Sequence, residues 1–255
     1  MNKSELCILI VALNEENFIE ESIESAISAC RTICENGRSA KVVVWVSDIS
    51  NDLTYDKSIQ YTPAIDVILE TDTSMGDAVN QFIKKNDFKY YCVIGGDDKL
   101  FAQGLLNSLN LFIQNHDKHS FVYGNIDIID EKNNLIKVYK GRHYNETKMF
   151  FKNIVPSQSV IFRSDLFKTL GGYDALLCAD WMLWIKMARL KPPRYVNRHI
   201  AQYRVHPGST SGSQKNKMAE STKSGTKLLL KGEGLSRYVK WLGAWSLIFY
   251  QKYIV

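Results

Sequence analysis

The 255-residue chain has few cysteines and few prolines, and it lacks a long apolar run. Its five cysteines are odd in number and include no Cys-x-x-Cys pair, which argues against a disulfide framework and favours a reducing compartment. No apolar run reaches the roughly 18 residues that a membrane-spanning helix needs, and no signal peptide precedes Leu6. We therefore expect a cytoplasmic protein, and we interpret Cys7, Cys30, Cys34 and Cys92 as small core residues rather than ligands.

The composition is that of an ordered globular protein. Hydrophobic residues make up 45% of the chain and charged residues 23%, so the apolar depletion that marks disorder is absent. The formal net charge of +5 is concentrated in residues 186–204 and after Lys215, which favours an anionic partner. A diphosphate or a lipid head group fits this charge, whereas the lack of an aromatic RNA-binding motif disfavours nucleic acid.

Short β-branched runs alternate with amphipathic stretches in the first hundred residues. This pattern predicts parallel strands at 6–13, 41–46, 65–69 and 90–94, with helices at 15–34 and 77–85. In such doubly wound sheets the ligand lies outside the carboxyl ends of the strands. The polar residues that follow the four strands should therefore converge on one edge: Asn14, Asp48, Asp72 and Asp97.

The rest of the chain has a mixed pattern. We expect a helix at 101–114, strands at 121–129, 135–139 and 159–163, a helix at 180–190, and further strands around 194–203. The Ser-, Gly- and Lys-rich stretch 207–234 is typical of a mobile loop or linker. The stretch 235–255 combines aromatic and basic side chains, as does an interfacial helix on an anionic membrane. A packing helix or a homodimer contact is the alternative.

Asp97 and Asp98 are candidate metal ligands. They follow an apolar strand and two glycines, Gly95 and Gly96, which permit close approach of backbone and ligand. Hard carboxylate oxygens suit Mg²⁺ or Mn²⁺, and such an ion could bridge the phosphates of a nucleotide-sugar. A solvated turn is the alternative for this pair.

Six motifs in order resemble the inverting family 2 glycosyltransferases. The resemblance spans residues 6–211 and implies an α/β protein of the GT-A fold, with a Rossmann-like nucleotide-binding half, a mixed central sheet and a C-terminal helical tail. It is carried by the opening strand with Asn14-Glu15-Glu16, the turn at 46–52, the segments Glu70-Thr71-Asp72 and Gly76 to Asn80, the pair Asp97-Asp98, the segments Gly171-Gly172-Tyr173-Asp174 and Ala179 to Trp184, and Tyr203-Arg204-Val205-His206.

The resemblance also implies roles for individual residues. Asp180 corresponds to the general base that deprotonates the acceptor hydroxyl, and a helix N-cap is its alternative role. Asp97 and Asp98 correspond to the metal motif. Nucleotide-sugar contacts are expected from Val11, Asn14, Asp48, Asp72, Asp77, Asn80, Asp97, Arg204 and His206. The alternatives are a turn-stabilising role for Asp48, a helix cap for Asp77 and a satisfied surface histidine for His206.

Two positions depart from the family pattern. Ser47 replaces the first of two acids, and Ala179 stands where many members have Glu. These departures keep open a non-catalytic nucleotide-sugar-binding or membrane scaffold, although the retained Asp97, Asp98 and Asp180 argue against it. A nucleotidyltransferase is disfavoured because no Gly-rich basic loop follows the first strand. Asp98→Asn should abolish metal-dependent donor binding with little loss of fold if Asp98 lies on a solvent-facing rim.

The sequence thus predicts a catalytic domain over 1–212, divided into a donor-binding half at 1–100 and an acceptor-binding half at 101–212, followed by a flexible basic segment and amphipathic tail at 213–255. We expect Mn²⁺ or Mg²⁺ and a UDP-sugar donor. The expected acceptor is a glycan or a lipid-linked saccharide in surface polysaccharide synthesis. The Trp181 and Trp184 pair is expected in the core, because its helical spacing favours packing.

Overall fold

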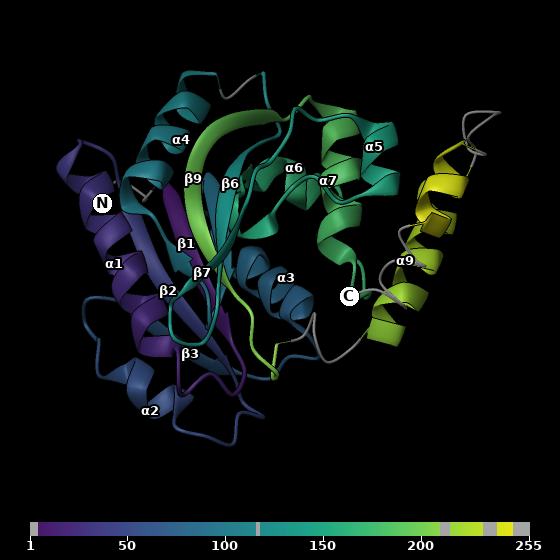
Figure 1. Cartoon of the computed structure of the whole chain (residues 1–255). Coiled ribbons are helices and arrows are strands. Elements are labelled where there is room, and N and C mark those ends of the chain that lie inside the picture. Colours follow the sequence, from purple (N-terminus) through teal and green to yellow (C-terminus); the bar gives the residue numbers. More distant parts are fainter. Residues whose placement is uncertain (1–4, 116–117, 210–214, 232–238, 247–255) are drawn as a thin grey trace.

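A single mixed sheet with helices on both faces forms the body of the protein (Figure 1). The computed structural model describes residues 5–115, 118–209, 215–231 and 239–246. The 9-stranded sheet has the order β3-β2-β1-β4-β8-β6-β9-β5, and β7 pairs with β6 outside this path. The predicted α/β class with a mixed central sheet is therefore confirmed.

The first half of the sheet is parallel, as the sequence pattern predicts. Its strands are β1 (Leu6–Ala12), β2 (Ala40–Ser47), β3 (Asp66–Glu70) and β4 (Tyr90–Gly95), and β1 pairs in parallel with both β2 and β4. The connecting helices are α1 (Ile19–Glu35), α2 (Thr54–Ile59) and α3 (Met75–Lys85). All four carboxyl ends consequently lie at one edge.

The first helix begins later than predicted, and α2 was not predicted. Backbone N–H groups of Glu15 and Glu16 donate to side chains of Thr54 (2.7 Å) and Asp52 (3.0 Å), so these residues belong to a turn rather than to a helix. The turn closes through the N–H groups of Phe18 and Ile19, which both donate to the Glu15 carbonyl. It is this turn that carries Glu15 toward the end of β4.

The second half mixes strand directions. Strand β8 (Ile161–Arg163) is antiparallel to β4 and β6, whereas β6 (Phe121–Ile129) is parallel to β9 (Arg194–Arg204). The predicted strands near 194–203 are thus one long strand. The remaining elements are β5 (Lys99–Leu100), α4 (Ala102–Gln114), β7 (Leu135–Tyr139), α5 (Glu146–Phe151), a 3-10 turn (Ser157–Ser159), α6 (Ser164–Thr169) and α7 (Ala179–Leu190).

Alternating side chains of the central strands pack into two hydrophobic cores, one on each face of the sheet. On β1, Cys7 and Leu9 pack on the face covered by α3 and α7, whereas Leu6, Ile8 and Ile10 pack on the face covered by α1 and α4. Trp181 and Trp184 are buried in the first core, which confirms the packing role predicted for them. The prediction of core cysteines is wrong for Cys34, which is exposed.

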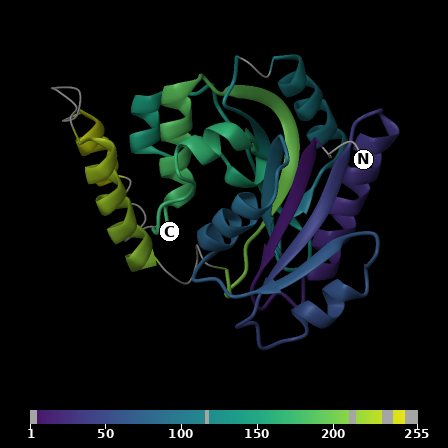
Figure 2. The same cartoon turned by 180° about the vertical axis from the view of Figure 1, so that it is seen from behind.

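Helix α9 (Lys215–Leu229) replaces the loop or linker predicted at 207–234. Its buried residues, Ala219, Thr222, Thr226 and Leu229, recur at helical spacing, a pattern that their small and polar side chains conceal in the sequence. A Cβ atom on Gly225 would lie 2.5 Å from the sulfur of Met182, so this glycine permits close packing on α7. Figures 1 and 2 both show α9 beside α5 and α7, far from β2 and β3.

A second helical stretch, residues 239–246, follows α9. Lys240 Nζ lies 2.7 Å from a carboxylate oxygen of Glu146 at the start of α5, and Ala244 is fully buried. The rest of the predicted tail at 235–255 lies outside the described residues. Within the described part of the chain, no helix is both long enough and apolar enough to cross a bilayer.

Candidate active site

The turns after β1, β2 and β3 meet at the carboxyl edge of the sheet. Asn14 adopts a left-handed backbone (φ 58°), and its Oδ1 accepts the N–H of Asn51 at 2.9 Å. Asp48 Oδ2 accepts the Thr71 hydroxyl at 2.5 Å, which joins the turns that follow β2 and β3. The structure therefore brings these predicted polar residues to one edge, where hydrogen bonds between neighbouring turns fix the backbone.

Two further predicted residues reinforce this edge. Asp72 Oδ2 accepts the indole N–H of Trp45 at 3.0 Å, so the buried β2 tryptophan holds the carboxylate that follows β3. The carbonyl of Val11, near the end of β1, accepts the N–H of Gly96 at 3.0 Å. Val11 thus fixes the start of the loop that carries Asp97.

A candidate metal site brings together Glu15, Asp97 and His206. One ligand atom from each of these residues lies within 4.8 Å of the others. His206 Nε2 is 3.1 Å from Asp97 Oδ2, and both side chains are largely shielded from solvent. Asp97 follows β4, Glu15 follows β1 and His206 follows β9, so the group is assembled from three strand ends. Two carboxylates and an imidazole suit a divalent cation such as Mn²⁺.

Glu15 bears directly on whether a cation fits. Its Oε2 is buried without a hydrogen-bond partner among the described residues. Burial, together with the neighbouring Asp97 and Asp52 carboxylates, raises the pKa of Glu15 to about 8. A buried, unpartnered carboxylate oxygen beside another carboxylate is an unfavourable arrangement that a bound cation would relieve. The residues present therefore fit the metal that the family pattern implies.

Gly95 and Gly96 provide room for protein atoms. A Cβ atom on Gly96 would lie 2.9 Å from both Ala12 Cβ and Glu15 Cγ, and one on Gly95 would lie 2.5 Å from Asp97 Oδ1. Side chains at these positions would push Glu15 and Asp97 apart. The close approach expected at this pair thus serves the assembly of the metal group.

Asp98 is not on a solvent-facing rim, contrary to the expectation from the sequence. Its side chain is only 3% exposed. Oδ1 accepts the N–H of Arg204 at 3.2 Å, and Oδ2 accepts the N–H of Gly95 at 3.3 Å. Burial raises the pKa of Asp98 well above its usual range, and the Asp97 carboxylate adds to this. Asp98 therefore fastens the β4 loop to β9, and the group that could hold a metal ion contains Glu15, Asp97 and His206 rather than Asp98.

Arg204 was predicted to reach a diphosphate, and the structure contradicts this. Its guanidinium is fully buried, and every N–H donor has an acceptor within the protein. Nε donates to the Asp97 carbonyl at 3.0 Å, and Nη2 donates to Glu21 at 3.0 Å. Nη2 also donates to Asn133, and Nη1 donates to the carbonyls of Asp130 and Glu131.

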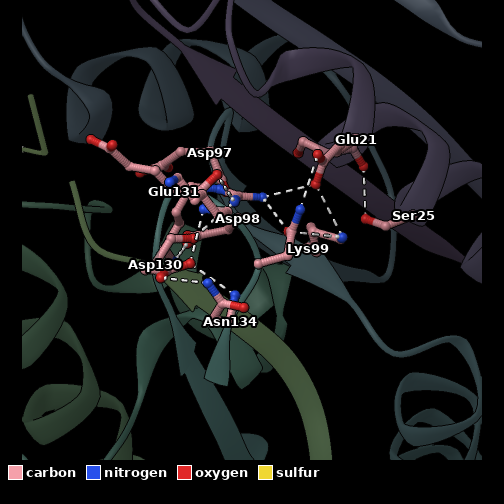
Figure 3. Close-up of polar contacts among 12 residues, drawn as sticks. Glu21, Ser25, Asp97, Asp98, Lys99, Asp130, Glu131 and Asn134 are labelled. Carbon is pink, nitrogen blue, oxygen red and sulfur yellow. Dashed lines mark hydrogen bonds and ion pairs between the residues drawn. The ribbon is translucent and has the colours of Figure 1, made fainter. Parts of the chain in front are cut away.

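Figure 3 shows polar contacts around the Asp97-Asp98 loop, with Glu21, Lys99 and Asp130 among the labelled residues. These contacts join Glu21 on α1, Lys99 on β5 directly after Asp98, and the turn that begins at Asp130. Lys99 Nζ lies 3.1 Å from Glu21 Oε2 and 3.3 Å from Asn133 Oδ1. Arg204 is thus a structural centre that fixes the backbone carrying Asp97.

His206 faces an open hollow beside the metal group. The hollow is lined by Asn17, Phe18, Glu131, His206, Pro207 and Gly208. The ring centroids of Phe18 and His206 are 4.9 Å apart. The guanidinium carbon of Arg204 lies 4.7 Å from the centre of the Phe18 ring. Phe18 therefore restricts the rotation of the imidazole. The alternative of an ordinary surface histidine does not fit these contacts.

Asp77 and Asn80 have structural partners. Ser74 is the N-cap of α3 and accepts the N–H of Asp77, while Asp77 Oδ2 accepts the N–H of Thr73 at 2.9 Å. Asp77 thus has the capping role that was its alternative. The Asn80 amide donates to the Tyr173 carbonyl and accepts the Tyr173 N–H, each at 2.9 Å. Its predicted donor contact is not supported, because both ends of the amide hold the turn before α7.

Asp180, the predicted base, is partly buried in the first turn of α7. The N-cap of this helix is Cys178, so the alternative role of Asp180 as N-cap is wrong. Asp180 Oδ2 accepts the Ser157 hydroxyl at 2.6 Å. Burial raises the pKa of Asp180, while the hydrogen bond from Ser157 opposes that rise.

Glu15 appeared in the sequence only as part of the Asn14-Glu15-Glu16 motif, and no motif indicated Glu21 or Ser157. Glu15 stands beside the predicted Asn14, and that adjacency was the available signal for it. Glu21 contacts Arg204, which is 183 residues away in the chain, and Ser157 contacts Asp180, which is 23 residues away. No local sequence pattern predicts either contact. Ser47, the departure from the family pattern, is 1% exposed, and its hydroxyl has no hydrogen-bond partner among the described residues.

Comparison with known proteins identifies the family. Residues 7–170 match the model of Glycosyl transferase family 2. The chain belongs to this family. A glycosyltransferase of Rickettsia prowazekii is 23% identical over 222 residues, which cover 84% of this chain and 68% of that protein. The PGL/p-HBAD biosynthesis glycosyltransferase of Mycobacterium bovis is 27% identical over 164 residues, covering 62% of this chain and 61% of that protein.

Solved structures share the GT-A fold of this family 2 glycosyltransferase. Staphylococcus aureus TarS 1-349 in complex with UDP-GlcNAc has a TM-score of 0.73 at 14% identity, covering 96% of this chain and 72% of that one. The mannosyltransferase PcManGT of Pyrobaculum calidifontis, in complex with GDP-Man and Mn²⁺, has a TM-score of 0.67 at 14% identity, covering 97% and 70%. At these identities the likeness shows the fold, with both neighbours bound to nucleotide-sugars.

Proposed function

We propose that this family 2 enzyme is a metal-dependent, inverting glycosyltransferase that uses a nucleotide-diphosphate sugar. The observation that carries the proposal is the assembly of Glu15, Asp97 and His206 at the carboxyl edge of the parallel strands. Ligands of open α/β sheets bind at this edge. The Mn²⁺ present in the PcManGT complex supports the same chemistry for this chain.

In this proposal Asp97 and His206 hold the cation, and Glu15 replaces Asp98 as the second carboxylate. A bound Mn²⁺ or Mg²⁺ would supply Lewis-acid stabilisation of the charge on the leaving diphosphate. Asp98 and Arg204 keep the Asp97 loop in place through hydrogen bonds to its backbone. The protein thereby prepares the ligand positions before the donor arrives.

Asp180 is proposed to remove the proton from the acceptor hydroxyl. Its raised pKa makes it a stronger base than an exposed aspartate, because burial disfavours its charged form. Attack by the acceptor oxygen opposite the departing diphosphate inverts the anomeric centre, so an α-linked donor gives a β-linked product. Asn80 on α3 holds the Gly172-Tyr173 turn through two hydrogen bonds to the Tyr173 backbone. It thereby connects the donor-binding half to the turn that precedes Asp180.

Asp48 and Asp72 are proposed to contact the nucleotide, with Val11 and Asn14 shaping the same edge. Asp48 and Asp72 each hold one oxygen in a hydrogen bond within the protein, which orients the carboxylates toward the edge of the sheet. UDP-sugars are the proposed donors, and TarS in complex with UDP-GlcNAc supports this choice. Residues 1–100 would then form the donor half and 101–212 the acceptor half of the catalytic domain.

A glycan or lipid-linked saccharide of surface polysaccharide synthesis is the proposed acceptor, handled at the cytoplasmic face of the membrane. Support comes from a basic aromatic surface, which we define as Lys223, Lys227, Trp241, Leu242 and Trp245. The two tryptophans and Leu242 are each at least 45% exposed. Lys223 Nζ lies 5.9 Å from the centre of a Trp245 ring. Indoles beside lysines are typical of proteins that bind the surface of an anionic bilayer.

Binding and turnover of a donor panel test the proposal. UDP-GlcNAc, UDP-glucose and GDP-mannose would be titrated calorimetrically with and without Mn²⁺, and release of the nucleoside diphosphate would be followed by chromatography. We expect at least one donor to bind only with Mn²⁺, and Glu15→Gln to weaken that binding. Equal binding with and without metal would contradict the metal assignment.

The same panel separates the enzyme from a non-catalytic scaffold. Asp180→Asn should bind the donor as tightly as the wild type and lose about 10²- to 10⁴-fold in nucleotide release. If wild type and Asp180→Asn are equally inert while both bind donor, the scaffold alternative replaces the enzyme.

A further inference from the structure

A chain of hydrogen bonds ends on the Asp180 carboxylate. The indole N–H of Trp184 points to Ser157 Oγ at 2.9 Å, and Ser157 Oγ lies 2.6 Å from Asp180 Oδ2. An indole N–H can only donate, so the Ser157 oxygen is the acceptor of that bond. The Ser157 proton is consequently directed to Asp180, and the order of donors runs from Trp184 through Ser157 to Asp180.

Rigid packing holds both upstream members of this chain. Trp184 lies four residues after Asp180 on α7, so the two share a helix face, and its side chain is 1% exposed. Ser157 opens a 3-10 turn in which Ser159 donates both its N–H (3.0 Å) and its hydroxyl (2.7 Å) to the Pro156 carbonyl. The Ser157 hydroxyl therefore has little freedom to leave the carboxylate.

We propose that Ser157, oriented by Trp184, is a positioning residue that fixes one oxygen of Asp180 and leaves the other for the acceptor hydroxyl. This inference rests on the proposed role of Asp180 as the base. A carboxylate held by one oxygen keeps a single rotamer, which lowers the entropic cost of aligning it with the attacking hydroxyl. Serine is the smallest side chain that can both accept from the indole and donate to the carboxylate.

The hydrogen bond from Ser157 lowers the pKa of Asp180 against the effect of burial, together with hydrogen bonds from the backbone N–H groups of Trp181 and Asp180. Tyr173 from the preceding turn and Cys178 at the helix N-cap face the carboxylate. Burial raises the pKa of Cys178 to about 12 and raises that of Tyr173 as well, so both stay neutral near pH 7. Asp174, which acts on Cys178, forms an ion pair with Lys186 at 2.6 Å. Loss of the Ser157 proton donor should therefore move the Asp180 pKa upward.

The first test measures the position of Asp180 by its titration, without any substrate. Protein labelled with ¹³C at the aspartate carboxyl carbon would be titrated by NMR, with the Asp180 signal assigned through Asp180→Asn. Ser157→Ala should raise the Asp180 pKa by about one unit, since a hydrogen bond to a charged group is lost. Ser157→Thr, which keeps a hydroxyl, should restore the wild-type value.

The second test follows the same shift in turnover. With Mn²⁺ and the best donor of the panel, hydrolysis of the donor should fall about tenfold in Ser157→Ala, and its acid limb should move to higher pH by the NMR shift. Trp184→Phe keeps the ring but removes the donor to Ser157, so it should shift the limb in the same direction by less. Ser159→Ala is the matched control, because it loosens the same turn without touching Asp180, and its limb should not move.

The outcomes separate this inference from the function on which it rests. An unchanged Asp180 pKa in Ser157→Ala, together with an inactive Asp180→Asn, overturns the positioning role and leaves the base in place. Full activity of Asp180→Asn overturns the base assignment and this inference with it. If Ser157→Ala does not fold, an unmoved acid limb in Trp184→Phe overturns the positioning role.

Discussion

His206 and Asp97 are 109 residues apart in the chain, and yet the Nε2 of one lies 3.1 Å from the Oδ2 of the other. Their approach depends on the pairing of β9 with the second half of the sheet and on Asp98 and Arg204, which fasten the β4 loop to the end of β9. The candidate metal site is thus a product of the fold as a whole.

Asp97→Asn should remove metal binding and leave the fold intact. The Asp97 side chain is only 13% exposed and contacts His206. An amide of equal size should keep the packing but lose the negative charge that a cation needs. We expect Mn²⁺ affinity to fall by about 100-fold, and the rise in melting temperature that saturating Mn²⁺ gives the wild type to disappear. Differential scanning calorimetry with and without Mn²⁺ measures this. A Mn²⁺-dependent rise equal to that of the wild type would exclude Asp97 as a ligand.

Asp98→Asn should have the converse effect. Both carboxylate oxygens accept backbone N–H groups, so an amide would turn its NH₂ group toward the N–H of Arg204 or Gly95. Such a donor-to-donor contact in a buried place should cost about 1–3 kcal/mol of unfolding free energy. That loss lowers the melting temperature by about 2–4 °C per kcal/mol. A variant as stable as the wild type but unable to bind Mn²⁺ would return Asp98 to the metal site.

Arg204→Lys should destabilise the protein even though the charge is retained. One ammonium cannot replace five hydrogen bonds to acceptors that lie on separate turns, and Glu21 would lose its partner. We expect Arg204→Ala to lose about 3–5 kcal/mol of unfolding free energy by urea titration, with Arg204→Lys in between. The matched control is Arg198→Lys on the same strand, because Arg198 is exposed and should change stability by less than about 0.5 kcal/mol. Equal effects at both positions would refute the structural role.

The sequence predicted most of what local pattern governs. Short β-branched runs predict the parallel strands. Because parallel strands end at the same edge of the sheet, the sequence placed Asn14, Asp48, Asp72 and Asp97 at the correct edge. What the sequence could not settle was which of two adjacent acids points outward. A shift of the loop by one residue would exchange the positions of Asp97 and Asp98. The long-range hydrogen bond from the Arg204 N–H to Asp98 determines which of the two acids is buried.

Composition misled the prediction where small polar side chains build an interface. Helix α9 packs through Ala219, Thr222 and Thr226, and Gly225 permits its close approach to Met182, so its buried side carries hardly any of the large apolar residues that mark an amphipathic helix. Likewise Arg204 has the charge expected of a phosphate ligand. Its burial depends on acceptors from turns that are distant in sequence, and no local motif reports them.

Glu146→Gln should release residues 239–246 from α5. The carboxylate pairs with Lys240 and Arg189, each at 2.7 Å, and the hydrogen bonds from Arg189 and Lys240 lower the pKa of Glu146 against the opposing effect of its burial. A lowered pKa contributes stability at neutral pH, and that contribution is lost as the pH falls through the folded value. Trp241 and Trp245 fluorescence should therefore report detachment in the variant at pH 7, and in the wild type only on acidification.

The control for Glu146 is Glu35→Gln, an exposed acid at the end of α1. Both variants lose one negative charge, but only the first loses a bridge between α5, α7 and the C-terminal helical stretch. Limited proteolysis should cut Glu146→Gln faster between α9 and residue 239 than the control. Equal cutting rates would show that the buried Ala244 contact, rather than the ion pair, holds this stretch.

The basic aromatic surface should bind anionic vesicles through two separable contributions. Lys223→Gln with Lys227→Gln removes about 1 kcal/mol per lysine near an anionic surface, so binding to phosphatidylglycerol vesicles should fall and lose its salt dependence. Trp241→Ala with Trp245→Ala removes indole area that enters the head-group region, so binding should fall at all salt concentrations. Lys84→Gln with Lys118→Gln, two exposed lysines elsewhere, is the matched control. If no variant changes vesicle sedimentation while the tryptophan pair abolishes a concentration-dependent dimer in gel filtration, this surface is a contact between two copies of the chain.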